Sequence, residues 1–190
     1  MEVRTHYNAW EHQKELKKQD IPSREEIKMM AQSLPDDRLK ALFVILYLTA
    51  ARITEITREL KRGDIISTEY KGRKLILFNL PNRKNKGRTR KQIPIPVDKE
   101  RDLLEIALPY INQFNDPEQV LFPFNDRRAY QLISKHLKIN PHWIRHIRLT
   151  HLVVLHDFND QLLIRFAGWV DGRAAGHYME LKWKDILQKY

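Results

Sequence analysis

The stretch that decides the fold lies in the last third of the chain and reads His142-Trp-Ile-Arg145-His146, followed by Gly168-Trp169 and by Tyr178. A second arginine stands far upstream, in Thr49-Ala-Ala-Arg52-Ile-Thr-Glu55. Two arginines can hold the non-bridging oxygens of a phosphate with their planar forks, and a histidine and an indole N–H can add hydrogen bonds. A phenol with a pKa near ~10 is a weak nucleophile, so it needs a phosphate whose charge is already neutralised. Together these groups are the parts needed to cut a phosphodiester.

The same residues resemble the three sequence boxes of the tyrosine recombinases, the phage-integrase family. The family's first arginine sits in a Thr-Gly-hydrophobic-Arg-hydrophobic-Ser/Thr-Glu box, which residues 49–55 match with Ala50 in place of Gly. The second box, His-x-x-Arg-His, is matched by residues 142–146. The third is Gly-His/Trp followed nine residues later by Tyr, matched by Gly168-Trp169 and Tyr178. The resemblance covers roughly residues 21–190, and three ordered boxes are far more specific than one.

This resemblance implies site-specific cleavage and rejoining of DNA. Tyr178 would attack the scissile phosphate and give a 3′-phosphotyrosyl enzyme and a free 5′-hydroxyl. The covalent link keeps the bond energy, so the family needs neither ATP nor metal, and no cofactor is expected. Glu55 and His146 would support the site from behind. The family pattern marks as catalytic residues Arg52, Lys86, His142, Arg145, Trp169 and Tyr178.

Lys86 lies in a segment dense in lysine and arginine, residues 82–91. The family commonly carries its catalytic lysine in a hairpin as Lys-Gly before a Val-Pro-Leu-like strand. Lys86-Gly87, seven residues before Ile93-Pro94-Ile95, has that spacing, and Lys84 is the competitor. The other cations predict a solvated turn or contacts with the phosphate backbone. The expected DNA-binding residues are Arg83, Lys84, Arg88, Arg90 and Lys91.

Two other interpretations compete for His142 and His146. One is a hydrogen-bonded scaffold role near the start of a helix, and the other is a metal site, because the two side chains are four residues apart on an expected helix. The zinc motif HExxH, however, requires Glu at position 143, which is Trp here. No carboxylate is placed as an obvious third ligand. The sequence therefore predicts a phosphate-binding role for His142, a scaffold role for His146 and no metal.

Charge and composition favour a nucleic-acid partner. The 190 residues contain 34 Lys and Arg against 24 Asp and Glu, which gives a net charge of +10. A basic chain of this kind favours a polyanion, and double-stranded DNA is the expected partner. The chain contains no cysteine, which excludes disulfides, thiolate catalysis and cysteine-based zinc sites.

The chain shows no membrane or secretion signal. No apolar run approaches the ~20 residues that span a bilayer, and the polar start Met1-Glu-Val-Arg-Thr-His6 lacks signal-peptide character. We therefore expect a soluble protein of the cytoplasm; the family points to a prokaryotic cell or its virus or mobile element.

Periodicity predicts a mainly helical chain with a few strands. Ser23-Arg-Glu-Glu26 is a capping box that should open a helix, and residues 74–79 and 92–97 are typical of a strand pair, with 64–66 as a further strand. We expect one α+β domain at residues 21–190 with a small antiparallel sheet, preceded by a helical arm or linker at residues 1–20. The other expected helices span about 38–50, 53–60, 98–114, 127–137, 143–157, 161–167 and 179–189.

Three other functions compete with recombination. A type IB topoisomerase-like enzyme shares the chemistry but acts as a monomer, and a recombinase derivative that no longer cuts would only bind DNA. A basic structural or RNA-binding protein would not explain the ordered boxes. Family members usually carry a separate helical DNA-clamping domain, which residues 1–20 cannot supply, so the chain is either a catalytic fragment or a minimal recombinase. The family also predicts assembly of a tetramer on DNA.

Overall fold

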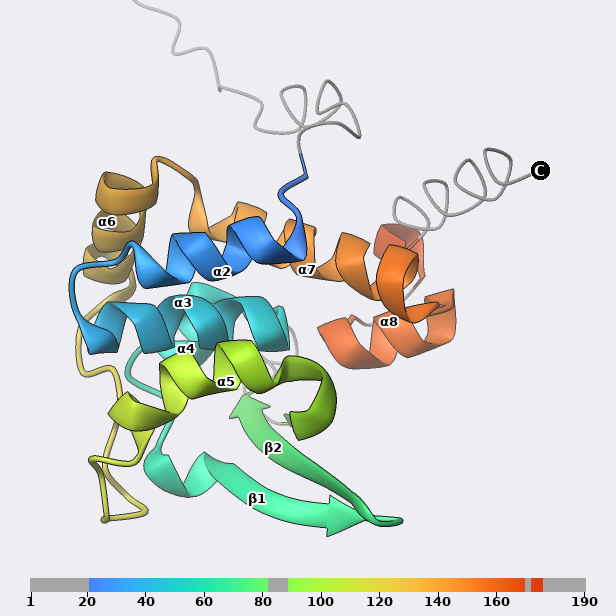
Figure 1. Ribbon diagram of the computed structural model, residues 1–190, viewed down its shortest axis with the longest axis horizontal. Coiled ribbons are helices and arrows are strands. Elements are labelled where there is room, and N and C mark those ends of the chain that lie inside the picture. Colours follow the sequence, from blue (N-terminus) through green and yellow to red (C-terminus); the bar gives the residue numbers. More distant parts are fainter. Residues whose placement is uncertain (1–20, 82–88, 170–171, 176–190) are drawn as a thin grey trace, which may run out of the picture.

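The computed structural model describes residues 21–81, 89–169 and 172–175. The expected N-terminal arm, the turn of the basic hairpin and the C-terminal helix lie outside these residues. Figure 1 shows a mainly helical domain with one small sheet. In chain order the elements are α2 (Arg24–Gln32), α3 (Asp37–Thr49), α4 (Ile53–Ile56), η2 (Arg62–Asp64), β1 (Ile65–Tyr70), β2 (Arg73–Pro81), β3 (Arg90–Pro96), α5 (Val97–Ile111), α6 (Asp126–Leu137), α7 (Pro141–His156) and α8 (Asp160–Ala167).

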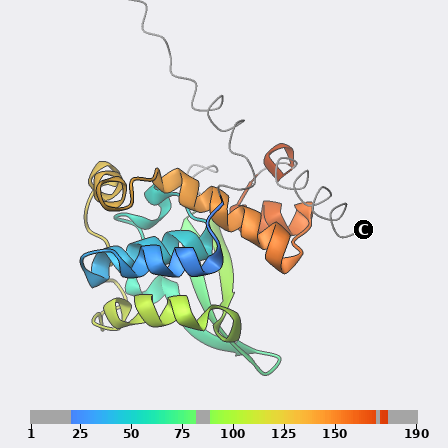
Figure 2. The same ribbon diagram turned by 45° about the horizontal axis from the view of Figure 1, so that its top comes forward.

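Helix α3 is the centre of the core. The Asp36 side chain caps its first turn by accepting from the Leu39 amide at 2.8 Å, and every residue from Ala41 to Thr49 is buried. Helices α2, α5 and α7 pack against it, and α2, α3 and α5 run side by side in Figures 1 and 2. Each buried Leu, Ile or Phe contributes about 1.5–3 kcal/mol relative to an exposed one. Because α3 is buried on all sides from Ala41 to Thr49, it holds the residues that follow it, beginning with Ala50, in a fixed position.

The sheet is antiparallel in the order β1-β2-β3. Its register pairs Ile65 with Phe78, and Phe78 with Ile93, so these apolar side chains share the face that packs on the core. Strand β3 is an edge strand, which explains why it accommodates Pro94 and Pro96. Along β3 the buried positions alternate, and they are Lys91, Ile93 and Ile95.

The structure confirms most of the predicted elements. The capping box at Ser23 is present, with Glu26 accepting from the Ser23 amide at 2.7 Å, and the strand pair forms as expected. The further strand also forms, but it spans Ile65–Tyr70 and not residues 64–66, because Asp64 ends the 3-10 helix η2. The helix after Arg52 is shorter than predicted and ends at Ile56, because Thr57 is extended and Arg58 takes a left-handed φ of 62°. The helix propensity of these residues did not predict this end, because contacts with distant parts of the chain set the backbone of the turn.

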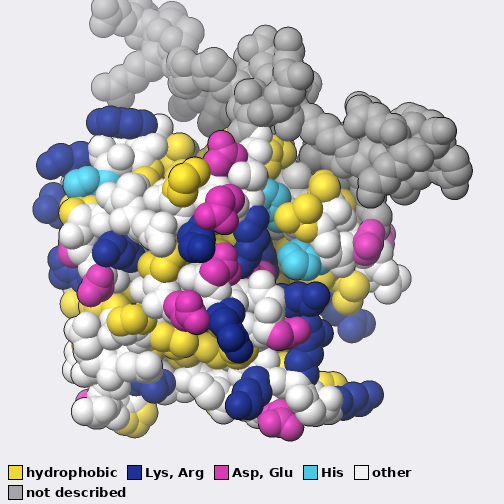
Figure 3. Space-filling view, in the orientation of Figure 1, with side chains coloured by type: hydrophobic (Ala, Val, Ile, Leu, Met, Phe, Trp, Pro, Cys, Tyr) yellow, Lys and Arg dark blue, Asp and Glu magenta, His cyan; other side chains and the backbone are white. Residues whose placement is uncertain are grey.

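Two surface properties accompany this fold. Among the described residues, no helix is long and apolar enough to cross a membrane. On the face shown in Figure 3, basic and acidic side chains are interspersed, and that face carries no extended patch of one sign.

Candidate active site

The site begins at the corner where α3 ends. Ala50 caps the helix in the left-handed conformation, with φ 45° and ψ 32°, and it is fully buried. A non-glycine residue in this conformation costs about 1–2 kcal/mol, which accounts for the glycine that the family pattern carries here. The reversal turns the chain so that Arg52 enters α4 from an extended backbone, with φ −76° and ψ 150°.

Glu55 holds Arg52 in two places. Its Oε1 accepts from Arg52 Nη1 at 3.0 Å, and its Oε2 accepts from the Arg52 main-chain N–H at 3.0 Å. The Glu55 side chain is 1% exposed and the Arg52 side chain 24% exposed. A buried carboxylate thus orients a guanidinium that still reaches the surface, which is the arrangement a phosphate-binding arginine needs.

Lys91 enters the same cluster from β3. Its Nζ lies 3.0 Å from Glu55 Oε2, and its side chain is 6% exposed. The contact is an ion pair without the alignment of a good hydrogen bond. Burial lowers the pKa of Lys91 to about 8, with Glu55 raising it and Arg145 and Arg52 lowering it further. This interior position differs from the surface DNA contact expected for Lys91.

The alternation of β3 explains the position of Lys91. Lys91, Ile93 and Ile95 share one face of the strand because successive side chains point to opposite sides. The period-two pattern Lys91-x-Ile93-x-Ile95 was therefore the signal that could have predicted a buried lysine. Arg90, on the other face, is exposed and lies 2.6 Å from Asp64 Oδ1. The remaining predicted cations of this segment, Arg83, Lys84, Lys86 and Arg88, lie outside the described residues.

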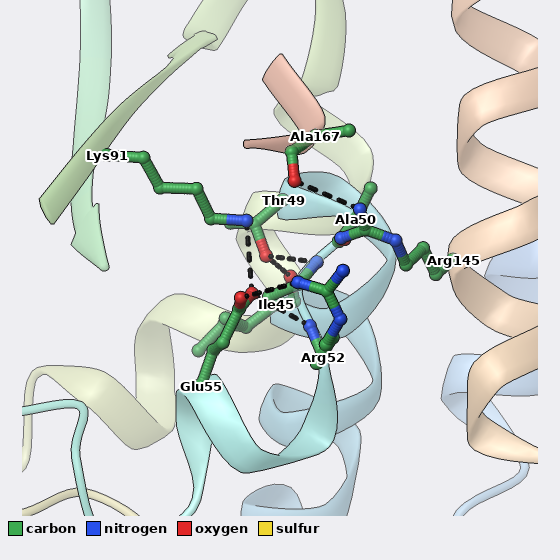
Figure 4. Close-up of polar contacts among 9 residues, drawn as sticks. Ile45, Thr49, Ala50, Arg52, Glu55, Lys91, Arg145 and Ala167 are labelled. Carbon is green, nitrogen blue, oxygen red and sulfur yellow. Dashed lines mark hydrogen bonds and ion pairs between the residues drawn. The ribbon is translucent and has the colours of Figure 1, made fainter. Parts of the chain in front are cut away.

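Helix α7 supplies the second arginine. Asn140 caps this helix by accepting from the His142 amide at 2.8 Å, and Pro141 occupies its first turn. One turn on, the buried Arg145 donates from Nη1 to the Ala50 carbonyl and from Nη2 to the Ala167 carbonyl, the latter at 2.9 Å. Figure 4 shows this guanidinium between the end of α3 and the end of α8.

The two histidines of α7 lie side by side. The rings of His142 and His146 meet edge to face with centroids 4.9 Å apart. Partial removal from water, followed by the charges of Arg145 and Arg52, lowers the pKa of His142 below its ordinary value. His142 is therefore neutral at pH 7 and able to accept a proton. Among the residues that the structure describes, no group of three potential ligands forms around a metal position.

Trp169 completes the cluster from the end of α8. Gly168 ends that helix with a left-handed φ of 68°, which turns the chain so that the Trp169 amide donates to the Ile164 carbonyl at 3.0 Å. The Arg145 guanidinium carbon lies 5.7 Å from the centroid of the Trp169 ring. This contact joins α7 to the third sequence box. Tyr178 lies outside the described residues.

The structure thus brings together residues from four distant segments. Three cations and one carboxylate meet at the cluster: Arg52, Lys91 and Arg145 with Glu55. The charges of both arginines act on His142, and the Trp169 ring lies against Arg145. Such a concentration of oriented donors and positive charge is suited to a phosphate.

Comparison with known proteins identifies solved structures with a similar fold. No family model and no curated protein matches the sequence. The fold is similar to the crystal structure of XerA recombinase, with a TM-score of 0.63, 16% identity, and coverage of 88% of this chain and 64% of that chain. It is also similar to XerH site-specific recombinase bound to its palindromic difH substrate in a post-cleavage complex, with a TM-score of 0.59 and 17% identity.

The chain has the fold of a tyrosine recombinase catalytic domain. A pre-cleavage complex of XerH with its difH substrate is similar as well, with a TM-score of 0.56 and 17% identity. The chain spans 64% of XerA and 50% of XerH, while 86–88% of the chain itself is matched by these structures. The predicted fold class is therefore confirmed: mainly helical α+β with a three-stranded antiparallel sheet.

Proposed function

We propose that the protein is a site-specific DNA recombinase that cleaves and rejoins strands through a 3′-phosphotyrosyl intermediate. The Tyr178 oxygen attacks the scissile phosphorus, the bond from phosphorus to the 5′-oxygen breaks, and a free 5′-hydroxyl leaves. Religation reverses these steps with a new 5′-hydroxyl as the attacking group. Because one phosphodiester bond is exchanged for another of similar energy, the proposed reaction needs no ATP. The cationic side chains around the phosphate would take the place of a metal ion.

The observation that carries this proposal is that Arg52 and Arg145, from separate sequence boxes, lie at the same corner of the fold, since Arg145 donates to the carbonyl of Ala50 just before Arg52. Glu55 orients the first guanidinium, and two main-chain carbonyls orient the second. Both charges act on His142. Two fixed forks beside a ring nitrogen are suited to the non-bridging oxygens of one phosphate, where they would stabilise the charge that develops in the transition state.

The proposed proton transfers use one base and one acid, with a further hydrogen-bond donor that does not titrate. His142, whose pKa is lowered, is neutral at pH 7 and would assist removal of the proton from Tyr178. The indole N–H of Trp169 would donate to a phosphate oxygen without titrating. Lys86 would protonate the leaving 5′-oxygen, as the family pattern implies for a hairpin lysine.

The proposed partners are double-stranded DNA and further copies of this chain. Site-specific exchange requires two DNA sites, and the resemblance implies a tetramer on DNA and a role in integration or in a mobile element, in the cytoplasm of a prokaryotic cell or its virus. XerH is described in complex with its own substrate. By analogy we infer that Arg83, Lys84, Arg88 and Arg90 contact the DNA backbone.

A nicked suicide substrate tests the proposal. Such a duplex loses its short 5′-hydroxyl strand after cleavage and so traps the covalent adduct, which denaturing gel electrophoresis detects. We expect an adduct with the wild-type protein in excess EDTA and none with Tyr178→Phe, whose DNA binding should be nearly unchanged. DNA binding without any adduct would identify a non-cutting derivative. An adduct with plasmid relaxation but no two-site recombination would instead identify a topoisomerase-like enzyme.

A further inference from the structure

Lys91 is a buried lysine that has no role in the reaction proposed above. Its ammonium group lies in the interior, 3.0 Å from Glu55, and the same carboxylate also holds the side chain and the main chain of Arg52. Figure 4 shows Lys91 and Arg52 approaching Glu55 from different sides. One carboxylate is thus shared by a lysine behind it and an arginine that reaches the surface.

An ammonium group at this position is costly for the fold. The neighbouring inward positions of β3 are Ile93 and Ile95, and an apolar side chain at 91 would match them. Lysine is among the residues least often buried, since the loss of hydration disfavours its charge. The counter-charge that Lys91 meets there is Glu55, which also orients Arg52, so the lysine points to a role in the site.

We propose that Lys91 is a positioning residue: its charge balances Glu55, so that Glu55 aligns Arg52 without cancelling the positive charge that Arg52 presents to the scissile phosphate. This inference rests on the proposed function and adds a residue outside the three boxes. In the cluster, three cations minus one anion (3 − 1) leave a charge of +2. With Lys91 removed, the charge is +1 (2 − 1). A phosphodiester has one negative charge and its transition state about two, so the wild-type cluster matches the transition state.

The groups that face Lys91 determine its response to pH. They are Glu55 on α4, Arg52 at the start of α4 and Arg145 on α7. With a pKa of about 8, Lys91 is charged at pH 7 and loses its proton as the pH rises further. The cleavage rate should therefore fall on the alkaline side, at a pH where Arg52 and Arg145 keep their charges.

Two substitutions separate the charge of Lys91 from its shape. Lys91→Met keeps an unbranched side chain and removes the charge, whereas Lys91→Arg keeps the charge at all working pH values. The matched control is Lys40→Met, because Lys40 also pairs with a carboxylate, Asp37 at 3.3 Å, but at the opposite end of α3. Thermal melting of each variant establishes that it is folded.

The experiment measures the single-turnover rate of adduct formation on the suicide substrate from about pH 6 to about pH 10. At pH 7, we expect Lys91→Met to be about 10- to 100-fold slower than wild type, a typical loss for the outer partner of an active group. Lys40→Met should match wild type. Lys91→Arg should cleave within about threefold of wild type and lack the alkaline fall that wild type shows near pH 8.

A substrate with a 5′-bridging sulfur distinguishes positioning from acid catalysis, since a thiolate leaves without help. We expect the defect of Lys91→Met to persist on it; rescue would make Lys91 the general acid and overturn the inference.

An equal rate for Lys91→Met and Lys40→Met would also overturn the inference and leave the proposed function intact. If wild type forms no adduct, the proposed function fails and the inference with it. If Lys91→Met does not fold, the cleavage rates of wild type and Lys91→Arg at alkaline pH provide the test. An equal fall in rate for both proteins would refute the role of Lys91.

Discussion

Arg145 and Arg148 lie three residues apart on α7 and are equally buried, at 3% exposure each, but their surroundings differ. Arg145 donates to two main-chain carbonyls. Arg148 Nη2 lies 2.7 Å from Glu100 Oε1, and its guanidinium carbon is 5.1 Å from the centroid of the Tyr47 ring. A carbonyl orients a guanidinium without cancelling its charge, whereas a carboxylate does both. Because both arginines are equally buried, we use the chemistry of their partners to assign Arg145 to the proposed phosphate site and Arg148 to the fold.

The surroundings of Arg148 form a clamp between helices. Glu100 on α5 also accepts from Arg24 of α2, and Arg24 reaches Asp102 as well, so α2, α5 and α7 meet there. The Nε and Nη1 atoms of Arg148 are buried without a hydrogen-bond partner among the described residues. We infer that this cluster, which we call the Glu100 clamp, serves the fold, while the cluster around Glu55 serves the reaction.

The largest expected effect on the cleavage rate is that of replacing the planar fork of Arg145. Arg145→Lys keeps one charge but loses the paired donors, and we expect adduct formation to slow by at least about 100-fold. Arg148→Lys is the matched control on the same helix. Its rate per folded molecule should remain within about threefold of wild type, measured by single-turnover cleavage. Equal losses in the two variants would refute the division between the two arginines.

The next effect concerns the Glu100 clamp. Glu100→Gln leaves Arg148 as a buried cation without its counter-charge, so the free energy of unfolding should fall by about 3–5 kcal/mol. Denaturant titration measures this change, with Glu105→Gln as the control because Glu105 is exposed on the same helix. The rate of the remaining folded protein should be unchanged, and a specific loss of rate would connect Glu100 to the reaction.

Acid should lower the stability of the fold through His151, which lies near the Glu100 clamp. His151 is buried, its Nδ1 lies 2.7 Å from the Tyr47 hydroxyl, and burial and the charge of Arg148 lower its pKa to about 4. The folded pKa is below the unfolded value, so the folded state binds fewer protons and stability is lost as the pH falls from about 6.5 to about 4. The loss should be about 3 kcal/mol. Denaturant titration over that range should show a loss that is smaller in His151→Gln than in wild type by about this amount, and an equal loss in both would refute the role of His151.

A smaller effect is expected at Trp169. Trp169→Phe keeps the ring against Arg145 but removes the indole N–H, and we expect cleavage to slow by about tenfold, the value of one hydrogen bond to a charged group. Trp169→His, the other residue that the family pattern accepts, should restore the rate to within about threefold. A rate for Trp169→Phe equal to wild type would mean that Trp169 only packs, and single-turnover measurements distinguish the two outcomes.

The smallest effect is expected at Ala50. Ala50→Gly relieves left-handed strain of about 1–2 kcal/mol, but it removes a buried methyl worth about 0.8 kcal/mol and gives the unfolded chain more freedom, worth about 0.4–1 kcal/mol. These terms nearly cancel, so the free energy of unfolding should change by less than about 1 kcal/mol. A larger change in a denaturant titration would show that the corner also positions the Ala50 carbonyl for Arg145.

Much of the fold and of the site could be predicted from local patterns. The Ser23 capping box, the apolar helix before Arg52 and the strand pair depend on neighbouring residues, and each appears in the structure. The pairing of Arg52 with Glu55 follows from their three-residue spacing, because the two residues are close in the sequence. The helix after Arg52 was predicted too long, since its end depends on tertiary contacts of the following turn.

The sequence by itself determined which residues are available for the proposed reaction, because the ordered boxes specify residue types and spacing. The tertiary structure alone decided what surrounds each charge. Arg145 and Arg148 are similar in sequence context, yet one meets carbonyls from α3 and α8 and the other meets Glu100 of α5. Lys91 belongs to a basic segment, yet the β3 register turns it inward onto Glu55. The physical reason is that the effect of a charge depends on its distance to other charges and on its burial, and long-range packing sets both.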